Sequence, residues 1–354
     1  MKLLLPLLAV LAFVGLWLFW PRAWAQYPDS PHFDAASGRF DNLQPMRGVT
    51  FADGVSGLGM MLLGDRRYGP TSPLPTQTPD WDTFLQAAEH SRFIWFGHSA
   101  LLARMAEQTI AIDPVLGPSV SPLRFQMRRF QAPAAPLAEW PTPDVVLISH
   151  NHYDHLEEAS IRHLAQTPTR FIVPLGLSAY LTPLGVKPDA ITELDWWQSS
   201  DAGAVRITLV PAYHNSGRGM RDGNRSFWGG YVLQQGGETF YYSGDSIWGG
   251  HFAEIAQRFP TIDIAFIENG QYDRRWPDNH MFPEQTAQAA AVINARRTMP
   301  VHWGAYSMAF HPWDEPVRQS VPKMRELGLS PLTPVQGQVF DVITVTDDWF
   351  APAP

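Results

Sequence analysis

The stretch Ser149-His150-Asn151-His152-Tyr153-Asp154-His155 decides how this sequence is interpreted. It continues an apolar, strand-like run at 144–149 and precedes a helix-like segment at 156–165. His150 and His152 are two residues apart, so at the end of an extended strand their side chains fall on the same side. Asp154 and His155 come where the chain turns into the helix and can aim at a second point nearby. The stretch therefore offers two imidazoles to one metal ion, and a carboxylate with an imidazole to another.

Three further candidate ligands close apolar runs elsewhere in the chain. His214 follows a strand-like run, Asp245 follows another at a point where Gly244 permits a sharp turn, and His302 ends a third. An α/β domain places its site at such strand ends. Taken singly, these residues also fit a loop histidine, a turn or helix N-cap aspartate, and a histidine at the edge of the core. Together with the first stretch they supply enough ligands for two metal ions that share one carboxylate.

The chain has 354 residues and no cysteine. This length suits one large domain or two modest ones. The absence of cysteine excludes disulfides, catalytic thiols, thiolate zinc sites and iron–sulfur clusters. A metal site must therefore use His, Asp and Glu, and 12 His are present. The formal net charge of -8 weighs against phosphate-backbone binding, so we expect no nucleic-acid partner.

Strand-like and helix-like runs mix from residue 92 to the C-terminus. Strands are expected at 92–96, 110–113, 144–149, 170–174, 204–210, 263–267 and 299–302, a hairpin at 231–242, and helices at 156–165, 283–297 and 314–327. We therefore expect one layered α/β domain over 92–354, with two sheets between helices. Residues 26–91 are rich in Pro, Gly, Asp and Ser and predict an irregular arm that packs on this domain through its aromatic side chains.

Residues 1–25 have the features of a targeting segment. They open with Lys2, run without charge to Trp20 and end in Ala23-Trp24-Ala25, which resembles a cleavage site. The apolar stretch lies between the roughly 7–15 residues of a signal-peptide core and the roughly 20 of a membrane span. We expect a membrane anchor or, as the alternative, a cleaved signal peptide. Either places the remaining chain in the periplasm or on a membrane facing it.

The order of these motifs resembles the metallo-β-lactamase superfamily, and several phrases within it look like those of N-acyl-phosphatidylethanolamine phospholipase D. These phrases are Trp95-Phe96-Gly97-His98-Ser99-Ala100-Leu101, Ile112-Asp113-Pro114, Pro211-Ala212-Tyr213-His214, Ser243-Gly244-Asp245 and Val301-His302-Trp303-Gly304. The resemblance covers roughly residues 93–311. It implies a four-layered αββα sandwich and a zinc-dependent phosphodiesterase that acts on N-acyl-phosphatidylethanolamine or a related phospholipid.

The resemblance also implies a ligand assignment. His150, His152, His214 and Asp245 would hold one zinc ion, and Asp154, His155, Asp245 and His302 would hold the other. It places His280 beside the substrate phosphate, and it makes Asp154 and His280 the catalytic residues. Tyr153 and His311 are further candidates for substrate contact, and His98 is interpreted as a structural or supporting residue. Manganese or iron would also suit ligands without thiolate.

Physical chemistry independently supports hydrolysis at such a centre. Two divalent ions about 3.5–4 Å apart can share a water, lower its pKa toward neutrality and hold the attacking and leaving oxygens. With Asp154, Asp245 and a hydroxide counted against the two ions, a net charge of about +1 remains, which favours anionic substrates. The expected partners are a phospholipid or a small anionic ester and, if residues 1–25 are retained, a membrane.

The same residues are compatible with two alternative functions. A lactonase or other ester hydrolase could use the same two-metal centre, and an envelope protein could bind metal without turnover. Structural zinc sites are usually single and closed, which weighs against the second of these. His280 could equally be a surface loop histidine near a helix start. Trp196, Phe227 and Trp228 could line an apolar approach to the metals, although aromatic runs are more often part of the core.

The export prediction can be tested directly. A reporter enzyme fused after Ala25 should be active only outside the cytoplasm, because Lys2 stays inside whether residues 1–25 are an anchor or a signal peptide. The measurement is reporter activity in fractionated cells, with the unfused reporter as the control. Activity of the fusion in the cytoplasm would contradict the prediction.

Overall fold

The structure is a computed structural model that describes residues 24–42, 44–46, 68–219 and 221–350. The expected anchor or signal peptide at 1–25 therefore lies almost wholly outside the described residues. Within those ranges, no helix combines the length and the apolar character needed to cross a bilayer.

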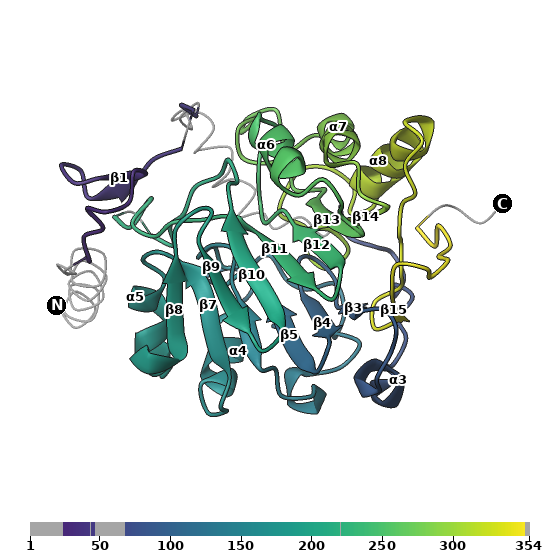
Figure 1. The fold of residues 1–354 in the computed structure, drawn as a ribbon. Coiled ribbons are helices and arrows are strands. Elements are labelled where there is room, and N and C mark those ends of the chain that lie inside the picture. The colour runs from purple at the N-terminus through teal and green to yellow at the C-terminus, as the bar shows by residue number, and fades with distance from the viewer. Residues whose placement is uncertain (1–23, 43, 47–67, 220, 351–354) are drawn as a thin grey trace, which may run out of the picture.

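Two mixed sheets lie face to face at the centre of the molecule (Figure 1). The larger sheet has the order β15-β3-β4-β5-β6-β7-β8, and the smaller has the order β14-β13-β12-β11-β10-β9. Strands β5 to β8 run parallel to one another, and so do β12 to β14, whereas the remaining neighbours are antiparallel. The strands are β3 (Arg92–Trp95), β4 (Leu101–Met105), β5 (Gln108–Ile112), β6 (Val145–Leu147), β7 (Arg170–Pro174), β8 (Ile191–Leu194), β9 (Ser199–Ala202), β10 (Val205–Val210), β11 (Gly230–Gln235), β12 (Glu238–Tyr242), β13 (Ile264–Glu268), β14 (Arg297–Val301) and β15 (Val339–Phe340).

Alternation along each strand divides the apolar side chains between two cores. Val145 and Leu147 of β6 join the core between the sheets, whereas Val146 and the following Ile148 join the core beneath the helices. Both faces of β6 are therefore covered, which is why this segment has an unbroken apolar sequence.

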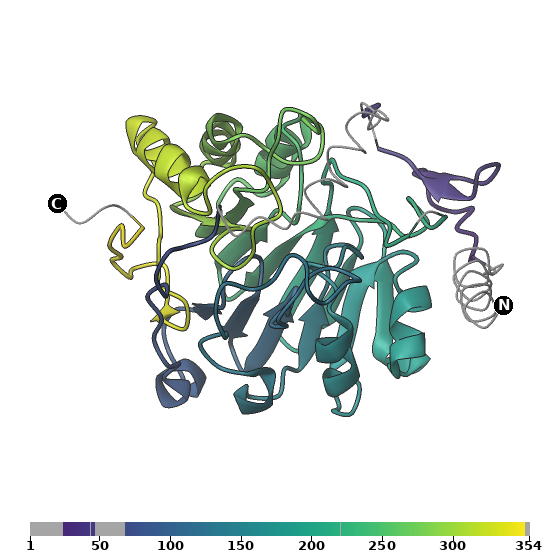
Figure 2. The same ribbon diagram turned by 180° about the vertical axis from the view of Figure 1, so that it is seen from behind.

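Helices cover the outer face of each sheet (Figure 2). Helices α3 (Trp81–Leu85), α4 (Glu158–Leu164) and α5 (Ser178–Leu181) pack on the larger sheet, and α6 (His251–Arg258), α7 (Pro283–Ile293) and α8 (Glu315–Glu326) pack on the smaller one. Short 3-10 turns lie at Leu137–Glu139, Thr182–Leu184 and Pro188–Ala190. The expected αββα sandwich is confirmed.

Several elements differ from the sequence-based expectation. Helix α7 ends before residue 297 because Asn294 adopts a left-handed conformation, with φ 51°. Strands β4, β8, β9 and β15 and helices α5 and α6 were not expected; β9 is a polar edge strand with the sequence SSDA, which carries no alternating apolar signal. Regular structure also begins before residue 92, with a small hairpin of β1 (Phe33–Asp34) and β2 (Arg39–Phe40) and with α3.

The topology brings the carboxyl ends of several strands to one edge of the sandwich. Strands β5 and β6 are parallel in one sheet, and β12, β13 and β14 are parallel in the other. Strand β10 shares the direction of β12, since each is antiparallel to β11. The loops that leave these strands carry most of the candidate ligands, and they therefore meet.

Tyr231 provides a test of how the two sheets are joined. Its hydroxyl, on β11, reaches the carbonyl oxygens of Ile148 and Ile172 of the opposite sheet at 2.8 and 3.1 Å. Tyr231→Phe should lower the free energy of unfolding by about 1–2 kcal/mol, because a buried acceptor loses its donor. The measurement is chemical denaturation followed by circular dichroism.

Tyr241 on the neighbouring strand β12 provides the matched control. Its hydroxyl is buried as well, but within the described ranges it has no hydrogen-bond partner. Tyr241→Phe should therefore leave the free energy of unfolding unchanged or raise it slightly. If both variants lost the same free energy of unfolding, the hydrogen bonds from Tyr231 to the opposite sheet would not contribute to stability.

Candidate metal centre

Asp245 lies at the middle of the candidate site. Its Oδ2 is 3.1 Å from His155 Nε2, 3.2 Å from His302 Nε2, 3.7 Å from His214 Nε2 and 3.8 Å from His150 Nε2. The residue is buried, and neither carboxylate oxygen has a well-aligned hydrogen-bond donor among the described residues. Burial opposes ionisation, but the charges of His155 and His302 outweigh it and hold the pKa of Asp245 well below its usual range.

A first group of three imidazoles, those of His150, His152 and His214, adjoins Asp245. His150 Nε2 and His152 Nδ1 are 2.9 Å apart, and His214 Nε2 is 3.2 Å from the same His152 atom. Burial lowers the pKa of His150 and His214 well below 6.5 and that of His152 to about 4. The rings are therefore neutral at pH 7, which is the form that binds metal. Their ring nitrogens converge on one another, as the ligands of a single ion would.

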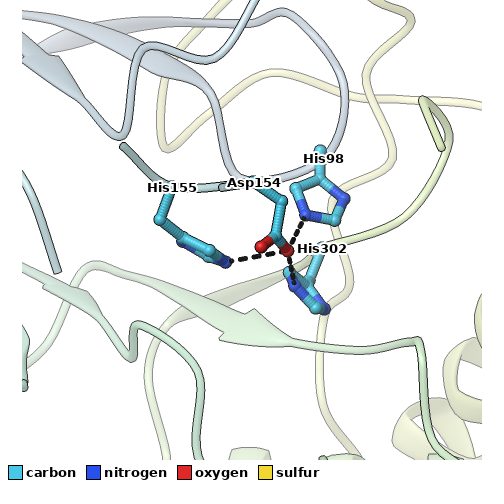
Figure 3. Close-up of side chains that lie close together, drawn as sticks. All are labelled: His98, Asp154, His155 and His302. Carbon is cyan, nitrogen blue, oxygen red and sulfur yellow. Dashed lines mark hydrogen bonds and ion pairs between the residues drawn. The ribbon is translucent and has the colours of Figure 1, made fainter. Parts of the chain in front are cut away.

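A second group surrounds the carboxylate of Asp154 (Figure 3). Asp154 Oδ2 is 2.9 Å from His98 Nε2, 3.2 Å from His302 Nε2 and 3.4 Å from His155 Nε2. His98, which we expected to be a structural or supporting residue, thus contacts a predicted ligand, and its position also allows it to bind metal. Burial lowers the pKa of His98 to about 3, so its ring is neutral at pH 7.

Asp113 orients one member of this second group, His155. It follows β5 and accepts hydrogen bonds at Oδ2 from His155 Nδ1 at 2.7 Å, the Ser149 hydroxyl at 2.6 Å and the Tyr242 hydroxyl at 2.5 Å. The contact places the proton of His155 on Nδ1 and leaves Nε2, which has no hydrogen-bond partner in the described part of the chain, facing the site. The sequence assigned no role to Asp113, although it ends an apolar strand in the same way as the predicted ligands.

His280 is buried in the centre, so its interpretation as a surface loop histidine is wrong. It is 6% exposed, and its Nδ1 is 3.8 Å from Asp245 Oδ2. Its ring centroid is 5.6 Å from that of His214 and 4.9 Å from that of His302, so it adjoins both groups. Its Nδ1 is also 2.9 Å from Oε1 of Glu268, a buried carboxylate at the end of β13 that sequence reasoning missed.

The two remaining predicted substrate contacts, Tyr153 and His311, pack against residues outside the two ligand groups. Tyr153 is half-buried and packs its ring against the guanidinium of Arg218 at 3.9 Å. The His311 ring stacks on Tyr272, with centroids 4.4 Å apart, and lines a neighbouring cavity of about 550 Å³. The substrate roles of Tyr153 and His311 stay predictions.

The aromatic residues named as candidates for an apolar approach lie in the core. Trp196, Phe227 and Trp228 belong to the core between the two sheets. The N-terminal arm closes over them, since the His32 ring packs on Trp196 and the Phe40 ring stacks on Phe227. The more common role of aromatic runs, as part of the core, is therefore confirmed for these three residues.

The donor set of the centre fits divalent metal ions. Among the residues that the structure describes, several buried atoms of the centre have no hydrogen-bond partner, notably both oxygens of Asp245 and Nε2 of His155. Leaving such atoms unsatisfied is costly unless a cation binds them. Imidazole and carboxylate ligands without thiolate suit zinc, manganese or iron.

The comparisons with known proteins agree with this geometry. Residues 108–303 match the family described as the β-lactamase superfamily domain. The chain is 32% identical over 277 residues to an uncharacterised protein of Mycobacterium tuberculosis, across 77% of this chain and 74% of that protein. It is 29% identical over 227 residues to N-acyl-phosphatidylethanolamine-hydrolyzing phospholipase D 1 of Caenorhabditis elegans, across 60% of this chain and 64% of that protein. The solved structure of Igni18, a metallo hydrolase of Ignicoccus hospitalis, shares the fold, with a TM-score of 0.54 at 20% identity over 71% of this chain and 97% of that one.

The fold and the clustered ligands define a metal-dependent hydrolase. The chain belongs to the metallo-β-lactamase superfamily, and within it the chain resembles the N-acyl-phosphatidylethanolamine phospholipases D.

The central position of Asp245 generates a prediction about metal content. Asp245→Ala should lose metal from both groups, because its Oδ2 adjoins imidazoles of each. Metal analysis of the purified protein by mass spectrometry checks this, with exposed Asp201→Ala as the control. Two retained ions and normal activity in Asp245→Ala would rule out a bridging position.

Proposed function

We propose that this protein is a two-zinc phosphodiesterase that acts on N-acyl-phosphatidylethanolamine or a related phospholipid. The observation that carries the proposal is the placement of His280, a buried imidazole that is not among the predicted ligands, against both ligand groups. The similarity to the worm phospholipase D supports the substrate class.

The proposed zinc ligands follow the two groups. His150, His152 and His214 would hold one ion, Asp154, His155 and His302 would hold the other, and Asp245 would contact both. When bound, the ions would supply a water of lowered pKa and a positive field for the developing charge. The imidazoles of the first group are already in the neutral form that binds metal. Burial opposes protonation of His155, but Asp245 and Asp154 raise its pKa well above 6.5, so an ion would have to displace the proton on Nε2 while Asp113 keeps the one on Nδ1.

His280 favours a phosphodiester over a lactone. A phosphodiester carries a charged non-bridging oxygen both before and during attack, and one hydrogen-bond donor beyond the metals can bind it. A neutral lactone offers no such charge before attack, so a further donor would add little. The contact with Glu268 holds His280 near the centre. His280 is not one of the metal ligands that we assign, so its ring can bind the substrate.

We further propose that the protein works outside the cytoplasm, retained through residues 1–25 or released after Ala25. A membrane-facing position would bring the site to phospholipid substrates. The composition of residues 1–25 supports this placement.

The function is tested with the purified zinc-loaded protein. Phosphodiester lipids, a chromogenic phosphodiester and acyl-lactones are assayed in parallel. Hydrolysis of the phosphodiesters supports the proposal. Lactone opening without phosphodiesterase activity would replace it with the lactonase alternative, and no turnover of any substrate would leave a metal-binding protein without this chemistry.

Replacement of His280 separates the two enzyme alternatives. His280→Ala should lower kcat/KM for phosphodiesters by roughly 10–1,000-fold, as expected for the loss of one positioned donor or proton-transfer group. The metal content of the same preparation should be unchanged. Exposed His163→Ala, on α4, is the control and should behave like the parent protein.

Two results would contradict the assigned role of His280. Unchanged phosphodiesterase activity would show that the imidazole does not act on the substrate. Loss of metal from His280→Ala would make it a ligand, which its distance to Asp245 and His302 permits.

A further inference from the structure

Glu268 is a fully buried carboxylate that the proposed function does not yet use. It is the last residue of β13 and has 0% exposure. Its Oε1 is 2.9 Å from His280 Nδ1 and accepts from the Met281 backbone N–H at 3.2 Å. Its Oε2 accepts from the backbone N–H of Ser246, the residue after Asp245. Glu268 therefore contacts both the loop that carries Asp245 and the loop that carries His280.

Within the described ranges, His280 is the ionisable side chain that pairs directly with Glu268. Those ranges provide no lysine or arginine contact to this carboxylate. A buried carboxylate without a cation is costly, and burial raises its pKa. The imidazole of His280 offsets part of that cost by donating from Nδ1.

We infer that Glu268 is a positioning residue that orients His280 for the phosphate group of the substrate. With the Nδ1 proton directed to Glu268, Nε2 is the ring nitrogen left for the substrate, and it donates to a phosphate oxygen when the ring carries both protons. Because the same carboxylate holds the backbone beside Asp245, it also fixes the distance between His280 and the proposed bridging ligand. The inference rests on the proposed function for its substrate, but the coupling between Glu268 and His280 can be measured without turnover.

Glu268 also makes contacts that do not involve His280, and each would have its own consequence. If Glu268 acted only through the Asp245 loop, its loss would disturb the metals. If it served only as an acceptor for two backbone N–H groups, its loss would have the same effect with or without His280. A double-mutant cycle distinguishes both cases from a role exerted through His280.

The experiment compares the zinc-loaded parent with Glu268→Gln, His280→Ala and the double variant. The first readout is the affinity for inorganic phosphate by calorimetry, and the second is kcat/KM for a chromogenic phosphodiester. Glu268→Gln should lower both by about 10–100-fold, in the range seen when a residue that orients a site side chain is replaced. In the His280→Ala background the same substitution should change both by less than about twofold, since the side chain that it orients is gone.

Glu238 provides a matched control. Its Oε1 lies 3.1 Å from His90 Nδ1, and its Oε2 accepts from the Ser91 backbone N–H at 3.0 Å, so it reproduces the contacts of Glu268 away from the metal centre. Glu238→Gln should leave phosphate affinity, kcat/KM and zinc content at the parent values.

Each outcome bears on the inference. An equal loss of phosphate affinity from Glu268→Gln in both backgrounds would overturn it, and so would loss of zinc from Glu268→Gln. If Glu268→Gln does not fold, Glu268→Asp replaces it, since a carboxylate one methylene shorter withdraws from His280 while keeping its charge. If the parent protein hydrolyses no phosphodiester, the proposed function fails, whereas the phosphate-binding cycle still decides whether Glu268 acts through His280.

Discussion

The structure depends on the burial of one carboxylate, that of Asp245, among imidazoles from separate segments of the chain. Burying a carboxylate costs several kcal/mol unless positive charge lies beside it. Without metal, protonated imidazoles provide that charge: despite the opposing effect of burial, Asp245 and Asp154 raise the pKa of His302 to about 10. Divalent ions would replace those protons. The fold must therefore place either protonated imidazoles or ligands for metal ions beside the carboxylate of Asp245.

The backbone around Asp245 is shaped to allow this convergence. Gly244 has φ 60°, and a Cβ there would lie 2.6 Å from the carbonyl oxygen of Gly229. A Cβ at Gly230 would lie 2.5 Å from the carbonyl oxygen of Tyr242. Both glycines let the end of β12 pass close to its neighbour β11 and turn into the site. Asp113 also links the two sheets. Its carboxylate accepts hydrogen bonds from Ser149, which follows β6 of the larger sheet, and from Tyr242 on β12 of the smaller sheet.

The sequence predicted the positions of the candidate ligands well because they share one simple pattern, a His or Asp that follows an apolar strand. The structure brings all of them together, although their role as ligands is still a prediction. Asp113 and Glu268 follow a similar pattern but were missed, because a single carboxylate after a strand can equally serve as a turn residue or cap. The place of His280 at the site could be predicted only from the family resemblance, since the loop from 269 to 282 has no periodicity that would indicate its burial. Its position depends on the contact with Glu268, and no local pattern in the sequence records that contact.

These two carboxylates alter the charge balance expected from the sequence. The ligands alone, with a hydroxide, leave about +1 beside two divalent ions. Asp113 and Glu268 each add up to one further negative charge to the centre. The carboxylate of Asp113 contacts the candidate ligand His155, and that of Glu268 contacts His280. The net charge of the whole centre then lies between about +1 and -1, so it favours an anionic substrate less than the ligands alone would. Selection of the proposed phosphodiester would therefore depend more on directed contacts, above all on a hydrogen bond from His280 to one phosphate oxygen, because such a bond depends on geometry more than on the net charge of the centre.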